Sequence, residues 1–236
     1  MSPDAFKQQA AEHAADLVEP GMVVGLGVGS TAIHALNRIA ARIRSGELPG
    51  VLAVPCSLAV ENAALAAGIP LTTLEDHPYI DLTIDGADEI DPYLNLIKGG
   101  GGALLREKIV AQASRREIIV ADASKLSPRL GERWPLPIEV LPFGWGAQAA
   151  FLESLGAAVV LRRNPDGSAY TTDQGNYVID ANFGPIDSPS FLATQLDARA
   201  GILAHGLFIS LATDLILAGP QGLQHLTPPA TSESGT

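Results

Sequence analysis

The sequence predicts an α/β fold: a larger, Rossmann-like domain with a parallel sheet, into which a smaller α+β domain is inserted. In the first half of the chain, apolar strand-like runs alternate with helical patterns, which is typical of parallel βαβ units. After about Lys125, prolines divide the sequence into short segments, and turn signals at 164–167 and 173–176 separate strand-like runs. Apolar, strand-rich sequence returns over 202–218 and can rejoin the first sheet. We therefore expect a larger domain from 1–126 and 203–222, a smaller domain over 127–202, and a disordered tail over 227–236.

Each expected strand of the first half is a short apolar run, and each expected helix has apolar residues at helical spacing. The first of these helices would start after Thr31 as its N-cap, with Ile33, Leu36, Ile39 and Ile43 on one stripe. The patterns predict strands at Met22–Leu26, Val51–Pro55, Ile80–Ile84 and Glu117–Ala121, and helices at Ala32–Ser45, Ala59–Ala67 and Ala103–Ser114.

Composition limits the possible classes of function. Of the 236 residues, 47% are hydrophobic, which is enough to build a core. The sequence has no run of about 18 uncharged apolar residues, the length that a membrane span requires, and its first residues lack an apolar signal region. The single cysteine, Cys56, fits a reducing compartment, so we expect a cytoplasmic protein. The net charge of −11 disfavours nucleic acid and anionic membrane as partners, but not a small anionic substrate.

The first candidate site is the glycine-rich turn Gly25–Thr31, between an expected strand and an expected helix. Glycines let the backbone approach a ligand, and the N–H groups of a helix N-terminus attract an anion such as phosphate. The spacing also matches a dinucleotide fingerprint, which would require an acid at the end of the second strand, where 55–57 has none. A tight turn without a ligand is the remaining alternative.

The second candidate is the acidic segment Asp85–Asp91, at the carboxyl end of an expected strand, where open α/β sheets bind ligands. Its acids lack the alternate-position spacing of a calcium loop, and no histidine joins them at ligand spacing, so we expect no metal. The alternative is a solvated acidic loop.

The third candidate joins the glycine run Gly99–Gly102 to the helix that follows it. Consecutive glycines cost backbone entropy, so they require a reason, either a ligand to wrap or a flexible hinge. Helical spacing places Glu107 on a stripe with Ala103, Val110 and Ala111. Partial burial there would raise the pKa of this carboxyl toward that of a useful general base, unless Glu107 belongs to an ordinary charged helix face.

A weaker candidate is Lys125, which follows the strand-like run ending at Ala121. A lysine at that sheet edge could meet a phosphate as a point charge, although a lone surface lysine is the alternative.

Taken together and in this order, the motifs resemble one family, ribose-5-phosphate isomerase A. Weaker similarity continues through NYVIDANF (176–183) and GLF (206–208), so the resemblance covers nearly the whole chain. The family's fold, a larger α/β domain with a smaller α+β domain inserted, agrees with the organisation read from the residues. The resemblance is carried by GVGSTA (27–32), DGADEID (85–91), KGGGGALLREKI (98–109), ADASK (121–125) and PLPIEV (135–140).

The resemblance implies roles for individual residues. Glu107 matches the family's general base, Lys98 a catalytic lysine, and Asp85 and Asp88 the active-site aspartates. The residues expected at the substrate are Val28, Gly29, Ser30, Thr31, Gly86, Ala87, Gly99, Gly100, Gly101, Lys125 and, by position only, Lys7.

The implied reaction interconverts D-ribose 5-phosphate and D-ribulose 5-phosphate by proton transfer through an enediolate, in the non-oxidative pentose phosphate pathway, without cofactor or metal. Sequence alone does not divide the proton-moving roles between Asp85 and Asp88. The chain departs from the family at Val28, where threonine is common, and at 55–60, a stretch poorer in hydroxyls. The resemblance also implies a homodimer or homotetramer.

Two alternatives from other classes are weaker. A non-catalytic sugar-phosphate sensor would usually carry a DNA-binding segment, and the segment before the first strand is too short for a helix-turn-helix. A nicotinamide oxidoreductase would require the missing strand-end acid.

Overall fold

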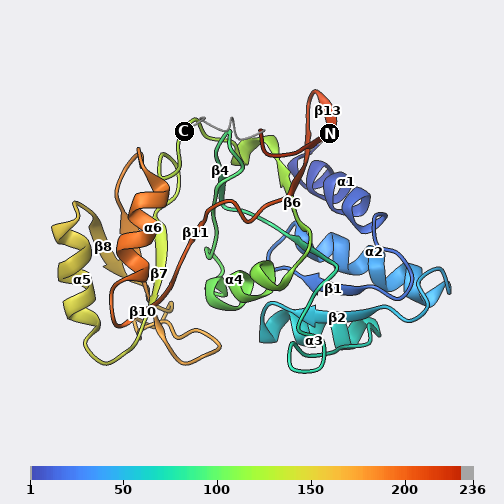
Figure 1. Ribbon diagram of the computed structural model, residues 1–236, viewed down its shortest axis with the longest axis horizontal. Helices are drawn as coiled ribbons and strands as arrows, with labels where there is room; N and C mark the ends of the chain where they lie inside the picture. Colours follow the sequence, from blue (N-terminus) through green and yellow to red (C-terminus); the bar gives the residue numbers. More distant parts are fainter. Residues whose placement is uncertain (1, 230–236) are drawn as a thin grey trace, which may run out of the picture.

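The structure is a computed structural model that describes residues 2–229. Its larger sheet has six strands in the order β13-β12-β6-β3-β1-β2 (Figure 1). All neighbouring pairs are parallel except β12 with β13, which form an antiparallel hairpin at one edge. The strands are β1 (Val23–Leu26), β2 (Leu52–Pro55), β3 (Leu82–Asp85), β6 (Glu117–Asp122), β12 (Asp214–Gly219) and β13 (Gly222–Leu226).

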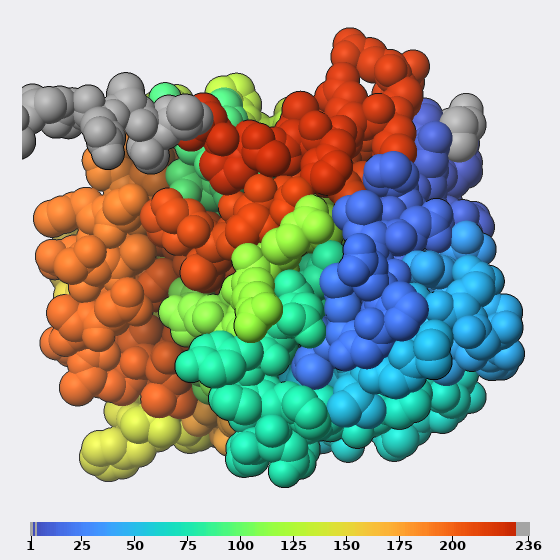
Figure 2. All heavy atoms as spheres, turned by 45° about the vertical axis from the view of Figure 1, so that its right-hand side comes forward, coloured from blue at the N-terminus to red at the C-terminus, as the bar shows by residue number. Residues whose placement is uncertain are grey.

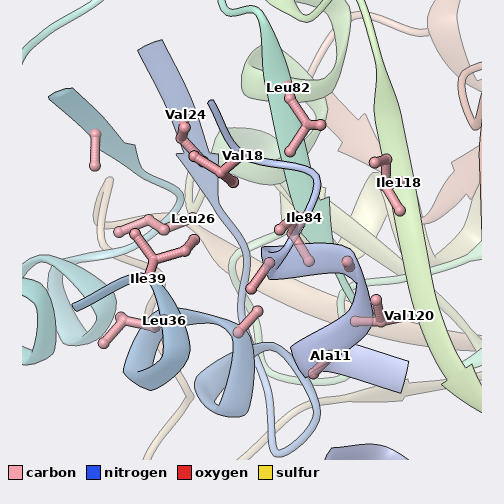
Figure 3. Packing of buried hydrophobic residues seen from close by; sticks show 14 of the residues in the cluster. Ala11, Val18, Val24, Leu26, Leu36, Ile39, Leu82, Ile84, Ile118 and Val120 are labelled. Atoms are coloured by element: carbon pink, nitrogen blue, oxygen red, sulfur yellow. The ribbon is translucent and has the colours of Figure 1, made fainter. Parts of the chain in front are cut away.

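Helices cover both faces of this sheet, as parallel crossovers require. Helices α1 (Pro3–Ala15), α2 (Ala32–Arg44) and α3 (Leu58–Ala67) contribute to the core cluster on one face (Figure 3). Helix α4 (Leu104–Ala113) packs on the other face through Val110 and Ala111. Gly68 ends α3 in the left-handed conformation, with φ of 77°, which glycine adopts without steric cost.

The buried stripe of α2 differs from the sequence prediction. Ile33 is exposed and Ile43 only partly buried, whereas alanines at 32, 35 and 40 are buried beside Leu36 and Ile39. The reason is that α1 presents alanines of its own to the same cluster, so small residues let the two helices approach closely. Thr31 occupies the N-cap position, but its side chain makes no capping hydrogen bond.

A second, four-stranded sheet forms from the middle of the chain and is antiparallel throughout, in the order β10-β7-β9-β8. Its core cluster includes residues of α5 and α6, and this part lies apart from the larger sheet in Figure 1. The elements are β7 (Leu136–Val140), α5 (Trp145–Ser154), β8 (Ala158–Leu161), β9 (Tyr177–Asn182), α6 (Pro189–Asp197) and β10 (Ile202–His205).

A short three-stranded sheet, β11 (Leu207–Phe208), β5 (Leu96–Ile97) and β4 (Glu89–Ile90), lies along the connection between the two larger sheets. Helix α4 also contacts β7 and β10, so it packs against both parts of the molecule. A 3-10 turn, Ala123–Lys125, follows β6. The catalytic candidates Glu107, on α4, and Lys98, directly after β5, therefore lie where the two parts meet.

The predicted fold class, a larger parallel α/β part with a smaller α+β part inserted, is confirmed. The expected boundary at residue 203 falls inside β10, which pairs with the smaller sheet, and residue 222 lies in the β12–β13 hairpin. The domain limits themselves remain a proposal. The expected disordered tail lies outside the described residues from position 230 onward. Within residues 2–229, none of the helices combines the length and apolar character needed to cross a bilayer.

Candidate active site

A cavity of about 110 Å³ opens at the carboxyl ends of β1 and β3, where the turn after β1, the acidic loop after β3, the glycine run and α4 converge. Every residue that lines it was among the candidates read from the sequence. The lining consists of Val28, Gly29, Ser30, Thr31, Gly86, Ala87, Asp88, Lys98, Gly99, Gly100, Gly101, Glu107 and Lys125.

The two remaining candidates contact this lining. Asp85 lies directly beneath it and pairs with Lys98. Lys7 of α1 donates from Nζ to Ser30 Oγ at 3.1 Å, and it shares an adjoining cavity with Lys125. Figure 2 shows the N-terminal residues beside the segment that follows β6, in agreement with the cavity that Lys7 and Lys125 share. A larger cleft of about 490 Å³ opens between the 71–76 loop and α4, but it contains none of the buried ion cluster.

The centre of the site is a buried cluster of ions around Lys98. The Lys98 Nζ lies 2.9 Å from Asp85 Oδ2, 3.0 Å from Glu107 Oε1 and 2.7 Å from the carbonyl oxygen of Gly86. The contacts with Glu107 and the Gly86 carbonyl are hydrogen bonds, whereas Asp85 Oδ2 is an ion-pair partner that accepts no hydrogen bond from the described residues. The three charged side chains are each at most 5% exposed, so solvent screens them little.

Asp85 is fixed on several sides. Its Oδ1 accepts hydrogen bonds from the backbone N–H of Val28 at 2.9 Å and of Gly86 at 2.7 Å, while Oδ2 faces Lys98. Gly27 is required for this arrangement, because a Cβ there would lie 2.2 Å from Asp85 Oδ1. Asp85 therefore orients Lys98 and the turn after β1, and it does not line the cavity.

Glu107 lies on the buried face of α4, as the sequence predicts, beside Leu104, Val110 and Ala111. Burial raises its pKa to about 7, against the opposing charge of Lys98 and together with the like charge of Asp85. Burial alone would lower the pKa of Lys98, but Asp85 and Glu107 reverse this effect and raise it above its ordinary value. Lys98 is thus held charged, and Glu107 can exchange a proton near neutral pH.

The two carboxylate oxygens of Glu107 differ. Oε1 accepts from Lys98, whereas Oε2 is buried and has no hydrogen-bond partner among the described residues. Because Glu107 lines the cavity, its unpartnered oxygen is available to take a proton from a bound molecule.

The glycine run is shaped by its neighbours. The backbone N–H of Gly100 donates to Asp88 Oδ2 at 2.7 Å, and a Cβ at Gly100 would lie 2.8 Å from Asp88 Oδ1. Gly99 and Gly102 have φ of 95° and 82°, which only glycine adopts readily. The run is therefore a fixed loop whose conformation requires glycine, and not a hinge.

At the other end of the cavity, the chain presents groups suited to an anion. Gly29 to Thr31 lead into the N-terminus of α2, with Gly29 at φ of 110°. Ser30 is exposed there, and Lys7 and Lys125 lie nearby. The N–H of Val28 is already used by Asp85, and the Val28 side chain packs against two apolar clusters. Within residues 2–229, no three His, Cys, Asp or Glu side chains form a metal-binding group.

Sequence reasoning missed two features. Glu117, at the start of β6, is 1% exposed, and neither of its carboxylate oxygens has a hydrogen-bond partner among the described residues. Burial, aided by Asp85, raises its pKa well above the ordinary value. A charged residue opening an otherwise apolar strand run was the available signal. The second feature, Arg162 of the smaller part, contacts the glycine run 62 or more residues away in sequence, which no local signal reveals.

Fold and site together define an α/β protein in which a buried carboxyl, Glu107, and a glycine-rich turn line one cavity at the same sheet edge. The family model of ribose 5-phosphate isomerase A (phosphoriboisomerase A) matches residues 52–222. A ribose-5-phosphate isomerase A from Chloroflexus aurantiacus is 57% identical over 100% of this chain and 97% of its own length. A ribose-5-phosphate isomerase A from Desulfatibacillum aliphaticivorans is 50% identical over 95% of this chain and 98% of its own length.

Solved structures agree. A D-ribose-5-phosphate isomerase in complex with phospho-erythronic acid superposes with a TM-score of 0.94 at 35% identity, covering 96% of this chain and 100% of the other. The ribose 5-phosphate isomerase from Plasmodium falciparum superposes with a TM-score of 0.91 at 40% identity, covering 95% of this chain and 98% of the other. The chain belongs to the ribose 5-phosphate isomerase A family.

Proposed function

We propose that the protein interconverts D-ribose 5-phosphate and D-ribulose 5-phosphate by moving one proton between C2 and C1 of the open-chain sugar. The observation that carries this proposal is the buried Glu107, whose pKa of about 7 and unpartnered Oε2 fit a base that must both take and return a proton. Membership of the ribose 5-phosphate isomerase A family supports the choice of substrate.

In the forward direction, Glu107 Oε2 takes the proton from C2. The electron pair of that bond forms the C1=C2 double bond, and the carbonyl oxygen on C1 gains negative charge. Return of the proton to C1, with transfer of a proton from O2 to O1, completes the ketose. No electron leaves the sugar, so the reaction is balanced without an oxidant.

Lys98 acts here through its charge. Its ammonium is paired with Asp85 and hydrogen-bonded to Glu107 and the Gly86 carbonyl, so it places a positive charge beside the proposed base that stabilises the enediolate. Asp88 lines the cavity and can move protons among the sugar oxygens, including during ring opening. Asp85 holds Lys98 in place. This division assigns the roles that the sequence left open.

The phosphate would lie at the turn after β1, against the N-terminus of α2, with Lys7 and Lys125 as nearby positive charges. The ligand of the solved relative, phospho-erythronic acid, pairs a phosphate with a carboxylate. A carboxylate resembles the two oxygens of an enediolate, so this ligand supports a site that holds phosphate at one end and developing negative charge at the other.

The test is direct incubation with ribose 5-phosphate and detection of ribulose 5-phosphate. E107Q keeps the shape of the side chain but cannot take a proton, so we expect kcat to fall by about 10²–10⁴-fold with substrate binding largely retained. A wild-type protein without isomerase activity would overturn the proposal, and E107Q with near-normal kcat would remove Glu107 from it.

We also propose that the protein works as a homodimer or homotetramer in the cytoplasm. Exposed apolar side chains on the smaller part, Leu141, Phe143, Phe191 and Leu203, support a self-association surface. Light scattering after size exclusion would give the oligomeric state, and a monomer would contradict the proposal.

A further inference from the structure

The glycine run is held from outside the larger sheet by an arginine of the smaller part. Arg162, directly after β8, donates from Nη1 to the carbonyl oxygens of Gly99 at 3.2 Å and Gly100 at 3.1 Å. Tyr170 adds a third contact, from its hydroxyl to the carbonyl oxygen of Gly101 at 3.3 Å. Three successive carbonyls of the loop are thus bound by two side chains of one hairpin.

These contacts fix the opposite edge of each peptide. In a trans peptide the C=O of one residue and the N–H of the next point in opposite directions. The N–H opposite the Gly99 carbonyl belongs to Gly100 and reaches Asp88. The N–H opposite the Gly100 carbonyl belongs to Gly101, and among residues 2–229 it has no hydrogen-bond acceptor. Gly101 lines the cavity. Because Arg162 binds the carbonyl side of the Gly100–Gly101 peptide, the Gly101 N–H on the opposite side stays free to donate.

Arg162 is itself firmly placed. Its Nε donates to Asp180 Oδ2 at 2.9 Å, and Nη2 pairs with the other oxygen of the same carboxylate, a two-pronged contact that lysine cannot reproduce. The guanidinium lies 5.7 Å from the centre of the Tyr170 ring. Its backbone donates to the Val178 carbonyl in β9 and accepts from Tyr170, and its side chain is 16% exposed. Arg162 therefore connects the smaller sheet to the glycine run and fixes the run relative to that sheet.

We propose that Arg162 is a positioning residue of the active site, which holds the Gly100–Gly101 peptide so that the Gly101 N–H points at the oxygen that gains charge in the enediolate. This inference rests on the proposed isomerase function. It gives that oxygen a backbone donor in addition to the positive charge of Lys98, whose ammonium is hydrogen-bonded to Glu107 and the Gly86 carbonyl. A fixed backbone N–H acts mainly on the transition state, because the charge appears there.

The first test compares R162Q with R163Q. The neighbouring Arg163 donates to the Gly167 carbonyl within its own hairpin, so R163Q removes a similar charge without affecting the glycine run. We expect R162Q to lower kcat by about tenfold or more while KM changes by less than about threefold, and R163Q to leave both unchanged. R162K keeps the positive charge but not the bidentate geometry of the guanidinium, so its kcat should lie between those of R162Q and wild type.

The second test reads the loop without the reaction. Hydrogen exchange of the peptide spanning Gly99–Gly102 should accelerate in R162Q, and in D180N to a smaller degree, but not in R163Q. If R162Q fails to fold, D180N serves as the variant for both tests, since it keeps the arginine but loosens it. A folded R162Q with wild-type kcat and wild-type exchange would overturn the inference. A wild-type protein without isomerase activity would overturn the proposed function instead, while the exchange result would still decide whether Arg162 holds the loop.

Discussion

Acidification should slow turnover through protonation of Glu107. The base must be ionised to take a proton, and its pKa is raised to about 7 by burial and by Asp85. Activity should therefore be full above neutral pH and fall as the pH drops through about 7. One pH unit below that value only about a tenth of the carboxyl remains ionised, so kcat should fall roughly tenfold. An unperturbed glutamate would give no loss until well below pH 6.

Removing the ammonium of Lys98 should raise the pH at which kcat falls to half of its full value. Lys98 Nζ lies 3.0 Å from Glu107 Oε1, and both side chains are buried. At an effective dielectric constant of about 20, two unit charges at this separation interact by roughly 5 kcal/mol, which corresponds to an upper limit of about 4 pKa units. Because structure and water relax around the lost charge, we expect K98M to shift the midpoint upward by about one unit or more, besides lowering kcat.

The assay is kcat against pH at saturating substrate, because kcat/KM would also report ionisation of the free substrate phosphate. Wild type and K98M are compared over a range in which circular dichroism shows both to be folded. A wild-type kcat that stays constant down to about pH 5 would refute the assignment of Glu107 as a buried base. A midpoint that moves to lower pH in K98M would refute the electrostatic role of Lys98.

Three further outcomes are expected. E117L should raise the free energy of unfolding, measured by urea denaturation, by about 1–3 kcal/mol, because it removes a buried carboxyl without hydrogen-bond partners. Because the pKa of Glu117 is raised in the folded protein, the wild type loses stability as the pH rises, so the advantage of E117L should grow toward alkaline pH. An E117L protein less stable than wild type at every pH would contradict this expectation. V28T should lower KM several-fold with little change in kcat if the added hydroxyl reaches the phosphate, whereas an unchanged KM would show that residue 28 serves only packing. Activity should survive dialysis against EDTA, since the described acids form no ligand set, and loss restored by a divalent ion would show otherwise.

Much of the site was predictable because parallel strands bring their carboxyl ends to one edge. Motifs after β1 and β3 had to meet there once the βαβ pattern was recognised, and helical spacing was enough to bury Glu107. The sequence could not show that Lys98 lies among three oxygens, since this depends on how the loop after β3, the segment after β5 and α4 pack against one another.

What escaped prediction depends on contacts between distant segments. Ile33 faces outward because the alanines of α1 require small partners, a constraint that the spacing within α2 alone does not contain. Arg162 and Tyr170 reach the glycine run only because the hairpin after β8 folds toward α4, and hairpin direction is not encoded in a local pattern. The limits of the two domains also remain a prediction for limited proteolysis to test.

Two buried glutamates, Glu107 and Glu117, differ in their contacts, and these differences favour Glu107 as the proposed base. Glu107 and Glu117 are both buried and both feel Asp85 and Lys98, and burial raises the pKa of each. Only Glu107 accepts a hydrogen bond from Lys98, and only Glu107 lines the cavity. Glu117 has no donor, so its protonated form is favoured and it cannot compete for the proton of a substrate. For Glu107, the hydrogen bond and charge of Lys98 oppose the effect of burial on the pKa, which fits a proposed base that must both take and return a proton.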